Sequence, residues 1–162
     1  METILILTTG GTIDKVYFDA KSAYEVGPPN ISTLLAELNL SINYRIVSVL
    51  RKDSLDLTDA DRQLLYDHVA DSEERCILIT HGTDTMVETG AKLQSISGKT
   101  IVLTGALQPA LFKTSDALFN IGCGLTAAQT LDSGVYIAMS GRVFEYNKVH
   151  KNHRTNRFEP LS

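Results

Sequence analysis

The sequence has 162 residues, 43% of them hydrophobic, and its 15 basic and 19 acidic side chains give a formal net charge of −4 at pH 7. A chain of this length and composition can bury a full hydrophobic core as one domain, which excludes disordered, collagen-like and mini-protein classes. The acidic balance, without long runs of like charge, argues against a nucleic-acid face or a polybasic membrane anchor and favours a small neutral or zwitterionic ligand.

Five short apolar segments rich in β-branched residues are predicted to be buried strands. They cover residues 3–8, 44–50, 76–80, 100–104 and 135–139, and segments with helical spacing lie between them at 31–38, 57–69, 85–93 and 116–130. Such alternation predicts parallel strands joined by helical crossovers on both faces. The expected fold class is therefore α/β, a three-layer α/β/α sandwich with a mainly parallel sheet.

Two of the predicted helices begin with a capping box, in which a Ser or Thr at the helix start is followed three residues later by an acidic residue. Thr58 and Asp61 form one such pair, and Thr85 and Glu88 form the other. We therefore expect both threonines to accept hydrogen bonds from backbone N–H groups at the starts of these helices.

Residues 9–30 form a long connection after the first predicted strand. The segment contains several glycines and prolines and little periodicity, whereas a strand-to-helix connection usually has about 2–6 residues. Long loops in compact domains are typically functional or disordered, so we expect this one to do more than link two elements.

The two cysteines, Cys76 and Cys123, are too few and too far apart for a disulfide framework or a CxxC metal site. Both lie among apolar residues, which predicts buried free thiols. The first eight residues lack the basic region and the long apolar run of a secretory signal, and no segment reaches the roughly 18 consecutive apolar residues of a membrane span. We therefore expect a cytoplasmic protein that makes no membrane contact.

Polar turns follow four of the predicted strands, at residues 8–12, 51–54, 80–85 and 105–109. In an open parallel sheet, ligands bind outside the carboxyl ends of the strands. We therefore expect these four turns to converge on one edge of the sheet and to form the functional site.

The first of these turns, Thr8-Thr9-Gly10-Gly11-Thr12, places two glycines directly after a strand. Glycines there let the backbone approach a ligand closely, and consecutive N–H groups can form an anion or oxyanion site. The turn lacks the Gly-Lys-Ser/Thr of a phosphate loop and the three-glycine spacing of a dinucleotide fingerprint, so nucleotide binding is not favoured. An ordinary tight turn is the structural alternative.

The third turn, His81-Gly82-Thr83-Asp84-Thr85, places a hydroxyl and a carboxylate at the start of a predicted helix, where free N–H groups can hold an oxyanion or a carboxylate. Helix capping is the structural alternative for these side chains. His81 has no second His or Cys at ligand spacing, which argues against a metal site, and no cofactor is expected.

A threonine hydroxyl becomes a useful nucleophile only when another group takes its proton. The sequence contains neither a GxSxG elbow nor an HExxH motif. Tyr24 and Lys151 are two titratable side chains that could take part in proton transfer, and an ordinary surface position is the structural alternative for both.

Six segments, taken in order, resemble the bacterial-type L-asparaginase family. They are residues 8–13, 22–27, 53–54, 81–86, 105–109 and 149–151, and the segments around Thr12 and around Thr83 and Asp84 match the family's two signature motifs almost residue for residue. The resemblance implies the fold of the family's larger N-terminal domain, without its smaller C-terminal domain. Residues 1–162 are thus expected to form a single domain similar to the short-chain asparaginases of purple bacteria.

The resemblance implies hydrolysis of the side-chain amide of L-asparagine to L-aspartate and ammonia. Thr12 would be the nucleophile that forms an acyl-enzyme, and Tyr24, on a mobile loop at residues 14–30, would orient or deprotonate it. Loop closure would exclude water and complete the site.

A second polar triad is implied at Thr83, Asp84 and Lys151, which would assist proton transfer and activate water. The residues before Lys151 depart from the family pattern, and Lys148 is the alternative to it. The implied substrate contacts involve the oxyanion donors Gly11 N–H and Thr83 N–H, Ser54 for the α-carboxylate, Asp84 for the α-amino group and the Ala106 carbonyl for the leaving nitrogen.

Two departures from the family bear on binding. Leu55 stands where secreted members carry a Gln that helps to bind the amino-acid backbone. The C-terminal domain, which the resemblance does not include, supplies an acidic contact to the α-amino group in two-domain members. We therefore expect weaker substrate binding than in two-domain members. Apolar surface left uncovered by the absent domain predicts a homo-oligomer built on a two-fold dimer.

Two alternatives to an asparaginase remain open. The preferred substrate could be glutamine or another small primary amide, since one methylene changes binding by only about 1–3 kcal/mol. The other alternative is a non-catalytic module that senses an amino acid in the same pocket, although such a module needs neither a nucleophile nor a proton relay.

Overall fold

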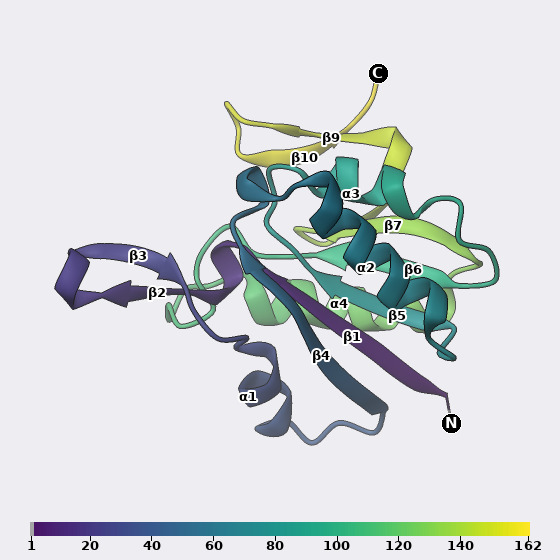
Figure 1. The fold of residues 1–162 in the computed structure, drawn as a ribbon, viewed down its shortest axis with the longest axis horizontal. Coiled ribbons are helices and arrows are strands. Elements are labelled where there is room, and N and C mark those ends of the chain that lie inside the picture. Colours follow the sequence, from purple (N-terminus) through teal and green to yellow (C-terminus); the bar gives the residue numbers. More distant parts are fainter. Residues whose placement is uncertain (1) are drawn as a thin grey trace.

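A six-stranded sheet with the order β4-β1-β5-β6-β7-β8 forms the centre of the computed structural model, which describes residues 2–162 (Figure 1). Its strands are β1 (Thr3–Gly10), β4 (Asn43–Lys52), β5 (Cys76–Thr80), β6 (Thr100–Thr104), β7 (Gly134–Met139) and β8 (Arg142–Glu145). The first five in the spatial order run parallel, and only β8 is antiparallel to its neighbour. The expectation of a mainly parallel sheet is confirmed.

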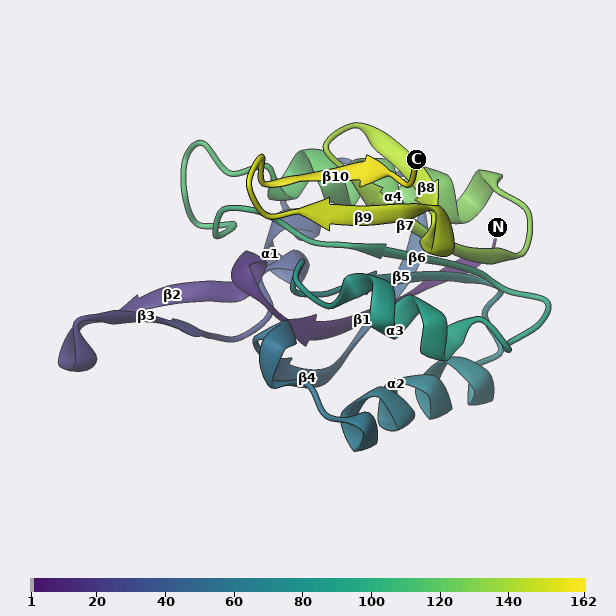
Figure 2. The same cartoon turned by 90° about the horizontal axis from the view of Figure 1, so that it is seen from above.

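Four helices cover the two faces of this sheet (Figure 2). They are α1 (Ile31–Ala36), α2 (Asp59–Asp71), α3 (Met86–Leu93) and α4 (Ala117–Thr130). Side chains of a strand alternate between faces, and in β1 Leu5 and Leu7 pack with residues of α2 and α3, whereas Ile4 and Ile6 pack with residues of α1 and α4. This confirms the three-layer sandwich. Within residues 2–162, none of the helices is long and apolar enough to cross a membrane.

The strand order reverses direction next to β1. The chain passes from β1 to the outer neighbour β4 and then returns to β5 on the other side of β1, before continuing outward through β6 and β7. Crossovers on either side of such a switch point leave a crevice at the carboxyl ends of the two central strands. The turns after β1 and β5 lie at this crevice.

The long connection after β1 is mostly regular, which differs from the irregular loop expected from the sequence. It forms a short 3₁₀ helix (Thr12–Asp14) and the antiparallel pair β2 (Lys15–Phe18) and β3 (Ala23–Val26). This hairpin projects away from the sandwich (Figure 1). Because its strands bury little apolar surface, they lack the hydrophobic alternation that predicts a strand.

The C-terminal segment forms a second hairpin, β9 (Val149–Asn152) and β10 (Arg157–Pro160), outside the main sheet. Val149 and Phe158 are buried and belong to the core on the α2 and α3 side of the sheet. Two apolar side chains thus fix the hairpin against the sandwich.

Of the two predicted capping boxes, one is confirmed. The Thr58 hydroxyl accepts from Asp61 N–H, and the Asp61 carboxylate accepts from Thr58 N–H. The prediction for Thr85 is wrong, since its hydroxyl donates at 2.9 Å to the carbonyl of Ser54. Tertiary structure thus uses this hydroxyl to join two turns instead of capping α3.

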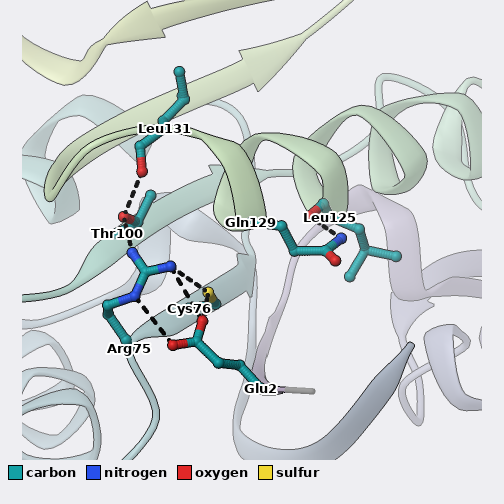
Figure 3. A network of polar contacts seen from close by, with 7 residues as sticks. All are labelled: Glu2, Arg75, Cys76, Thr100, Leu125, Gln129 and Leu131. Atoms are coloured by element: carbon teal, nitrogen blue, oxygen red, sulfur yellow. Dashed lines mark hydrogen bonds and ion pairs between the residues drawn. The ribbon is translucent and has the colours of Figure 1, made fainter. Parts of the chain in front are cut away.

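A polar network lies near the amino ends of β5 and β6 (Figure 3). Arg75 bonds to the Glu2 carboxylate at 3.1 Å and to the Thr100 hydroxyl at 3.3 Å, and Cys76 Sγ lies 3.4 Å from Glu2. Burial, followed by the contact with Glu2, raises the pKa of the Cys76 thiol. Cys76 is buried as predicted, whereas the prediction for Cys123 is wrong, because it is only partly buried on α4, where it lines an open groove.

Candidate active site

The turn after β1 requires glycine for two reasons. Gly10 and Gly11 have φ angles of 101° and 87°, which are unfavourable for residues with a side chain. A Cβ on Gly11 would also lie 2.5 Å from both Cα and N of Gly82. The backbone of the first turn therefore touches the backbone of the turn after β5.

Two further turns join this contact. A Cβ on Gly82 would lie 2.7 Å from Cβ of Ser54, in the turn after β4, and a Cβ on Gly105, in the turn after β6, would overlap the His81 carbonyl oxygen. The four polar turns therefore meet at one edge of the sheet, as expected from the parallel topology.

Lys151 reaches this edge from β9. Its Nζ donates to Thr83 Oγ1 at 2.7 Å and to Asp84 Oδ1 at 2.8 Å. The Lys151 side chain is 11% exposed and the Asp84 side chain 34%. A largely buried lysine side chain thus holds two polar side chains of the turn after β5, those of Thr83 and Asp84, in fixed positions.

Two histidines flank this cluster on the solvent side. His153 Nδ1 lies 3.7 Å from Asp84 Oδ1, and the ring is largely exposed. His150 and His153 line a cleft of about 230 Å³ together with Thr83, Asp84 and Lys151. The cleft opens the polar cluster to solvent.

Thr12 is half-buried and begins the 3₁₀ helix directly after the Gly11–Gly82 contact. Gly11 N–H, the first of the two expected oxyanion donors, donates to the Lys52 carbonyl at 3.0 Å in this structure. Thr83 N–H, the second expected donor, makes no hydrogen bond within residues 2–162. The parallel pairing of β1 with β4 extends to Gly10 and Lys52 and so takes up the Gly11 donor.

Tyr24 lies on β3, opposite Tyr17, and its side chain is half-exposed. Its ring packs edge-on against Tyr17 at 5.3 Å and against Phe112 at 5.7 Å between centroids. The structure therefore places Tyr24 on the projecting hairpin, in contact with two aromatic rings and apart from the cluster of Thr83, Asp84 and Lys151.

The base of the hairpin is fixed to the sandwich by Asp14. Its carboxylate accepts from Asn30 N–H at 2.9 Å, and its carbonyl accepts from Gly27 N–H at 2.8 Å. Burial raises the pKa of Asp14 to about 6, against the lowering effects of the Asn30 hydrogen bond and of Arg51. Asp14, which precedes β2, thus bonds to Gly27 and Asn30, which follow β3, and so joins the two ends of the hairpin.

Ser54 is buried where the turns meet, and Leu55 beside it is 73% exposed. The turn after β6 brings Ala106 to the same edge, also buried. Ser54 and Ala106 therefore border the crevice, and Leu55 faces solvent.

Two residues that the sequence analysis did not identify hold the Ala106 turn. The Asp116 carboxylate accepts from the N–H groups of Leu107 and Gln108 at 3.0–3.1 Å, and the Asn120 amide donates to the Gly105 carbonyl at 2.9 Å. Asp116 and Asn120 are four residues apart at the start of α4, a spacing that puts them on one helix face. Only that spacing could have indicated them from the sequence.

His81 is completely buried and both ring nitrogens are engaged, Nδ1 with the Gly82 carbonyl at 2.6 Å and Nε2 with the Thr89 hydroxyl at 2.7 Å. Burial lowers the pKa of His81 to about 4. The imidazole is therefore neutral near pH 7, and neither nitrogen is directed at a ligand.

Comparison with known proteins gives one consistent result. A probable periplasmic L-asparaginase of Haemophilus influenzae is 31% identical over 169 residues, which covers 96% of this chain and 48% of that protein. A glutaminase-asparaginase of Pseudomonas fluorescens is 27% identical and is covered to 48%. The crystal structure of L-asparaginase I from Vibrio cholerae superimposes with a TM-score of 0.86 at 27% identity, over 98% of this chain and 51% of that one.

The chain thus spans about half the length of the relatives it matches. The sequence model of the family described as "Asparaginase, N-terminal" matches residues 3–159. With the parallel sheet, the four converging turns and this match over nearly all of its length, the chain belongs to the asparaginase family.

Proposed function

We propose that the protein is an L-asparagine amidohydrolase that acts through a Thr12 acyl-enzyme. The observation that carries the proposal is the Lys151–Thr83–Asp84 cluster, held at 2.7 and 2.8 Å, one residue beyond the point where Gly82 touches Gly11. Thr12 follows Gly11, so the proposed nucleophile and the polar cluster lie on two turns in backbone contact. Family membership supports an amidohydrolase.

In the first half of the proposed reaction, Thr12 Oγ1 attacks the carbon of the substrate side-chain amide. The hydroxyl proton passes to the proton-transfer groups of the site, and the carbonyl oxygen becomes an oxyanion that accepts a hydrogen bond from Thr83 N–H. The tetrahedral intermediate then collapses, the C–N bond breaks, and the nitrogen leaves as ammonia after taking up a proton. An ester between Thr12 and the aspartyl group remains.

In the second half, water attacks the ester carbonyl and restores the Thr12 hydroxyl. Thr83 is suited to orient this water, because its Oγ1 accepts from Lys151 and its own hydroxyl proton stays free to donate to the water oxygen. The proton that the water loses passes through the proton-transfer groups of the site to Thr12 Oγ1 as the ester C–O bond breaks. The products are L-aspartate and ammonia, and atoms balance as amide plus water.

Tyr24 enters this scheme through movement of the β2–β3 hairpin. In the structure its ring is held against Phe112 and Tyr17, so we propose that substrate binding draws the hairpin toward Thr12. A closing segment of this kind excludes water and completes a catalytic constellation.

The substrate contacts that we propose come from three turns. Ser54 holds the α-carboxylate, the Asp84 carboxylate holds the α-amino group, and the Ala106 carbonyl accepts from the leaving nitrogen. Asp84 Oδ1 accepts from Lys151, so Oδ2 is the oxygen for the substrate ammonium. Leu55 supplies no polar group to the substrate, which predicts weak binding.

Glutamine is the second candidate substrate, since the relatives include a glutaminase-asparaginase. A third possibility is an amino-acid sensor without turnover. The experiment that separates the three is ammonia release from asparagine and from glutamine by the wild type and by Thr12→Ala, with hydroxylamine added to trap the acyl-enzyme as a hydroxamate.

We expect asparagine turnover that Thr12→Ala abolishes, together with a hydroxamate from the wild type. A higher rate with glutamine would transfer the assignment to a glutaminase. Binding of asparagine without ammonia release from the wild type would favour the sensor.

We further propose a homo-oligomer built on a dimer and a cytoplasmic location. Supporting the dimer is an open apolar groove of about 680 Å³ along α4, beside the exposed side chains of Leu118, Phe119 and Val143. Sedimentation should show a species larger than 17.8 kDa that Phe119→Asp dissociates and that the control Leu40→Asp, at another exposed leucine, leaves intact. A wild-type monomer would contradict the dimer, and fractionation of cells would test the location.

A further inference from the structure

A chain of hydrogen bonds leads from α2 through the buried centre of the site to the turn after β5. Arg62 Nε donates to Thr89 Oγ1 at 3.0 Å, His81 Nε2 lies 2.7 Å from the same hydroxyl, and His81 Nδ1 lies 2.6 Å from the carbonyl oxygen of Gly82. Thr89 and His81 are both 0% exposed. Arg62 comes from α2, Thr89 from α3 and His81 from the turn, so three separate segments build the chain.

The direction of every hydrogen bond in this chain is fixed by chemistry. A carbonyl oxygen can only accept, so Nδ1 of His81 carries the proton that is donated to Gly82. Burial lowers the pKa of His81 to about 4, and the neutral ring then has Nε2 as an acceptor. The Thr89 hydroxyl must donate to that nitrogen, and it accepts from the guanidinium of Arg62.

The Gly82 carbonyl, at which the chain of hydrogen bonds ends, belongs to the same peptide unit as Thr83 N–H. Peptide bonds in residues 2–162 are trans, and in a trans peptide the C=O and N–H groups point in opposite directions within one plane. A bond from His81 to the Gly82 oxygen therefore fixes the plane of the peptide whose N–H emerges on the opposite side. That N–H has no acceptor within residues 2–162.

We propose that Arg62, Thr89 and His81 are positioning residues that orient and polarise Thr83 N–H as the oxyanion donor of the site. The proposal rests on the proposed function, in which Thr83 N–H meets the oxyanion. All the donors point the same way, from the cation at Arg62 toward the developing negative charge. Hydrogen bonds aligned in this manner strengthen one another, and the effect is larger in a buried site of low dielectric.

Such an arrangement is also rigid before substrate arrives. Catalytic stabilisation of an oxyanion depends on donors that need no reorganisation during the reaction. The Gly82–Thr83 peptide is held from one side by His81, while the Gly11 and Ser54 backbones pack against Gly82. This chain of hydrogen bonds gives His81, whose ring nitrogens are both engaged, a role beside the cluster of Thr83, Asp84 and Lys151.

The first test uses NMR to observe the chain of hydrogen bonds directly, without a catalytic reaction. ¹⁵N and ¹H NMR of the wild type should show His81 as the neutral Nδ1–H tautomer at pH 7. Thr89→Val, which removes the hydroxyl at constant shape, should shift the His81 Nε2 resonance and move the Thr83 amide proton to lower chemical shift. Thr89→Ser, which keeps the hydroxyl, should restore both signals. An Nε2–H tautomer, or a Thr83 amide that does not respond to Thr89→Val, would overturn the proposal.

The second test measures catalysis in the same variants. Removing an oxyanion donor outright costs roughly 10²–10³ in kcat; here the donor remains but is less well fixed, so we expect about a tenfold fall in kcat for Thr89→Val. KM for asparagine should stay within about twofold, because ground-state contacts are kept. Thr89→Ser should return kcat to within about twofold of the wild type.

Arg62→Gln provides a second variant in case Thr89→Val does not fold. Its half-exposed side chain lies at the start of the chain of bonds, and a smaller fall in kcat is expected. Arg45→Gln is the matched control, because Arg45 pairs with Glu74 at an exposed position away from the site and should leave kcat unchanged. Equal kcat for Arg62→Gln, Thr89→Val and wild type would contradict the positioning role.

The two proposals fail in different ways. A wild type that releases no ammonia from either amide would remove the proposed function and with it the oxyanion role, while the NMR result would still decide whether the chain of hydrogen bonds controls Thr83 N–H. If the wild type releases ammonia and the substitutions at Thr89 and Arg62 leave kcat unchanged, the proposed function stands and the positioning role of these residues is rejected.

Discussion

Lys151 Nζ donates to Thr83 Oγ1 at 2.7 Å, although 68 positions separate the two residues in the sequence. The contact joins β9, which lies outside the main sheet, to the turn after β5 at its centre. Lys148, the alternative considered from the sequence, instead pairs with Glu145 and is 71% exposed. The structure therefore offers a direct comparison between a buried lysine at the site and an exposed neighbour.

Replacing Lys151 with Met should lower kcat by roughly 10²–10⁴, the usual contribution of a positioned proton-transfer group. Methionine is unbranched and only one atom shorter than lysine, but it cannot donate to Thr83 and Asp84. Steady-state ammonia release is the measurement. Lys148→Met is the matched control and should retain wild-type kcat; a loss at Lys148 with activity kept at Lys151 would exchange the two assignments.

Tyr24→Phe tests the role of the hairpin hydroxyl. The ring contacts with Tyr17 and Phe112 are kept, so the melting temperature should not change. We expect kcat to fall by about 100-fold, in line with the loss of a general acid–base group. Tyr17→Phe removes a hydroxyl from the facing residue on the same hairpin and should have no effect; equal losses in both variants would argue against a specific role for Tyr24.

Leu55→Gln should improve substrate binding. Leu55 is 73% exposed beside the buried Ser54, and an amide at this position can add a hydrogen bond to the substrate backbone. One hydrogen bond contributes about 1 kcal/mol, so KM for asparagine should fall by about fivefold while kcat changes little. Leu55→Met, which adds no polar group, should leave KM unchanged, and a KM that does not fall in Leu55→Gln would refute the assignment of this edge.

Asp14→Asn should stabilise the protein at neutral pH. The pKa of Asp14 is about 6 in the folded protein, because burial disfavours its charge, against an ordinary value of 3.8. Between about pH 4 and 6 the folded state therefore holds a proton that the unfolded state has lost, so stability falls as the pH rises through this interval. A shift of about two units corresponds to about 3 kcal/mol, which is an upper estimate of the gain at pH 7.

Denaturant unfolding of Asp14→Asn and wild type from pH 3.5 to 7.5 measures this effect. The two curves should lie closest together below pH 4 and separate as the pH rises to 6. The asparagine oxygen can still accept from Asn30 N–H, so the hairpin base is preserved. Asp19→Asn, at an exposed position of the same hairpin, should show no such divergence, and parallel curves for Asp14→Asn would contradict a buried, poorly solvated carboxyl.

The interior of the sheet was predictable because its strands are buried on both faces and are continuously apolar. Residues of β5 and β6 are all buried, and both strands begin and end at the predicted residues. The hairpins β2–β3 and β9–β10 were not predicted. They bury few side chains, so no hydrophobic period marks them, and their pairing depends on turns and on contacts with the sandwich.

The candidate site was predictable to the extent that it lies in the turns after parallel strands. Thr83, Asp84 and Lys151 are brought together, whereas Tyr24 is not adjacent to them and Gly11 N–H is taken by Lys52. Arg62 and Thr89 carry no sequence signal, because their relation to His81 arises only when α2 and α3 pack side by side. Contacts between side chains of separate elements cannot be derived from periodicity.

The attachment of Lys151 has a consequence for how the protein loses activity. Its hairpin, β9–β10, shares no backbone ladder with the six-stranded sheet and is anchored mainly by Val149 and Phe158. Local opening of such a unit costs less free energy than global unfolding. Amide hydrogen exchange in β9 should therefore be faster than in β5, and on warming the proposed activity should be lost while the central sheet is still intact.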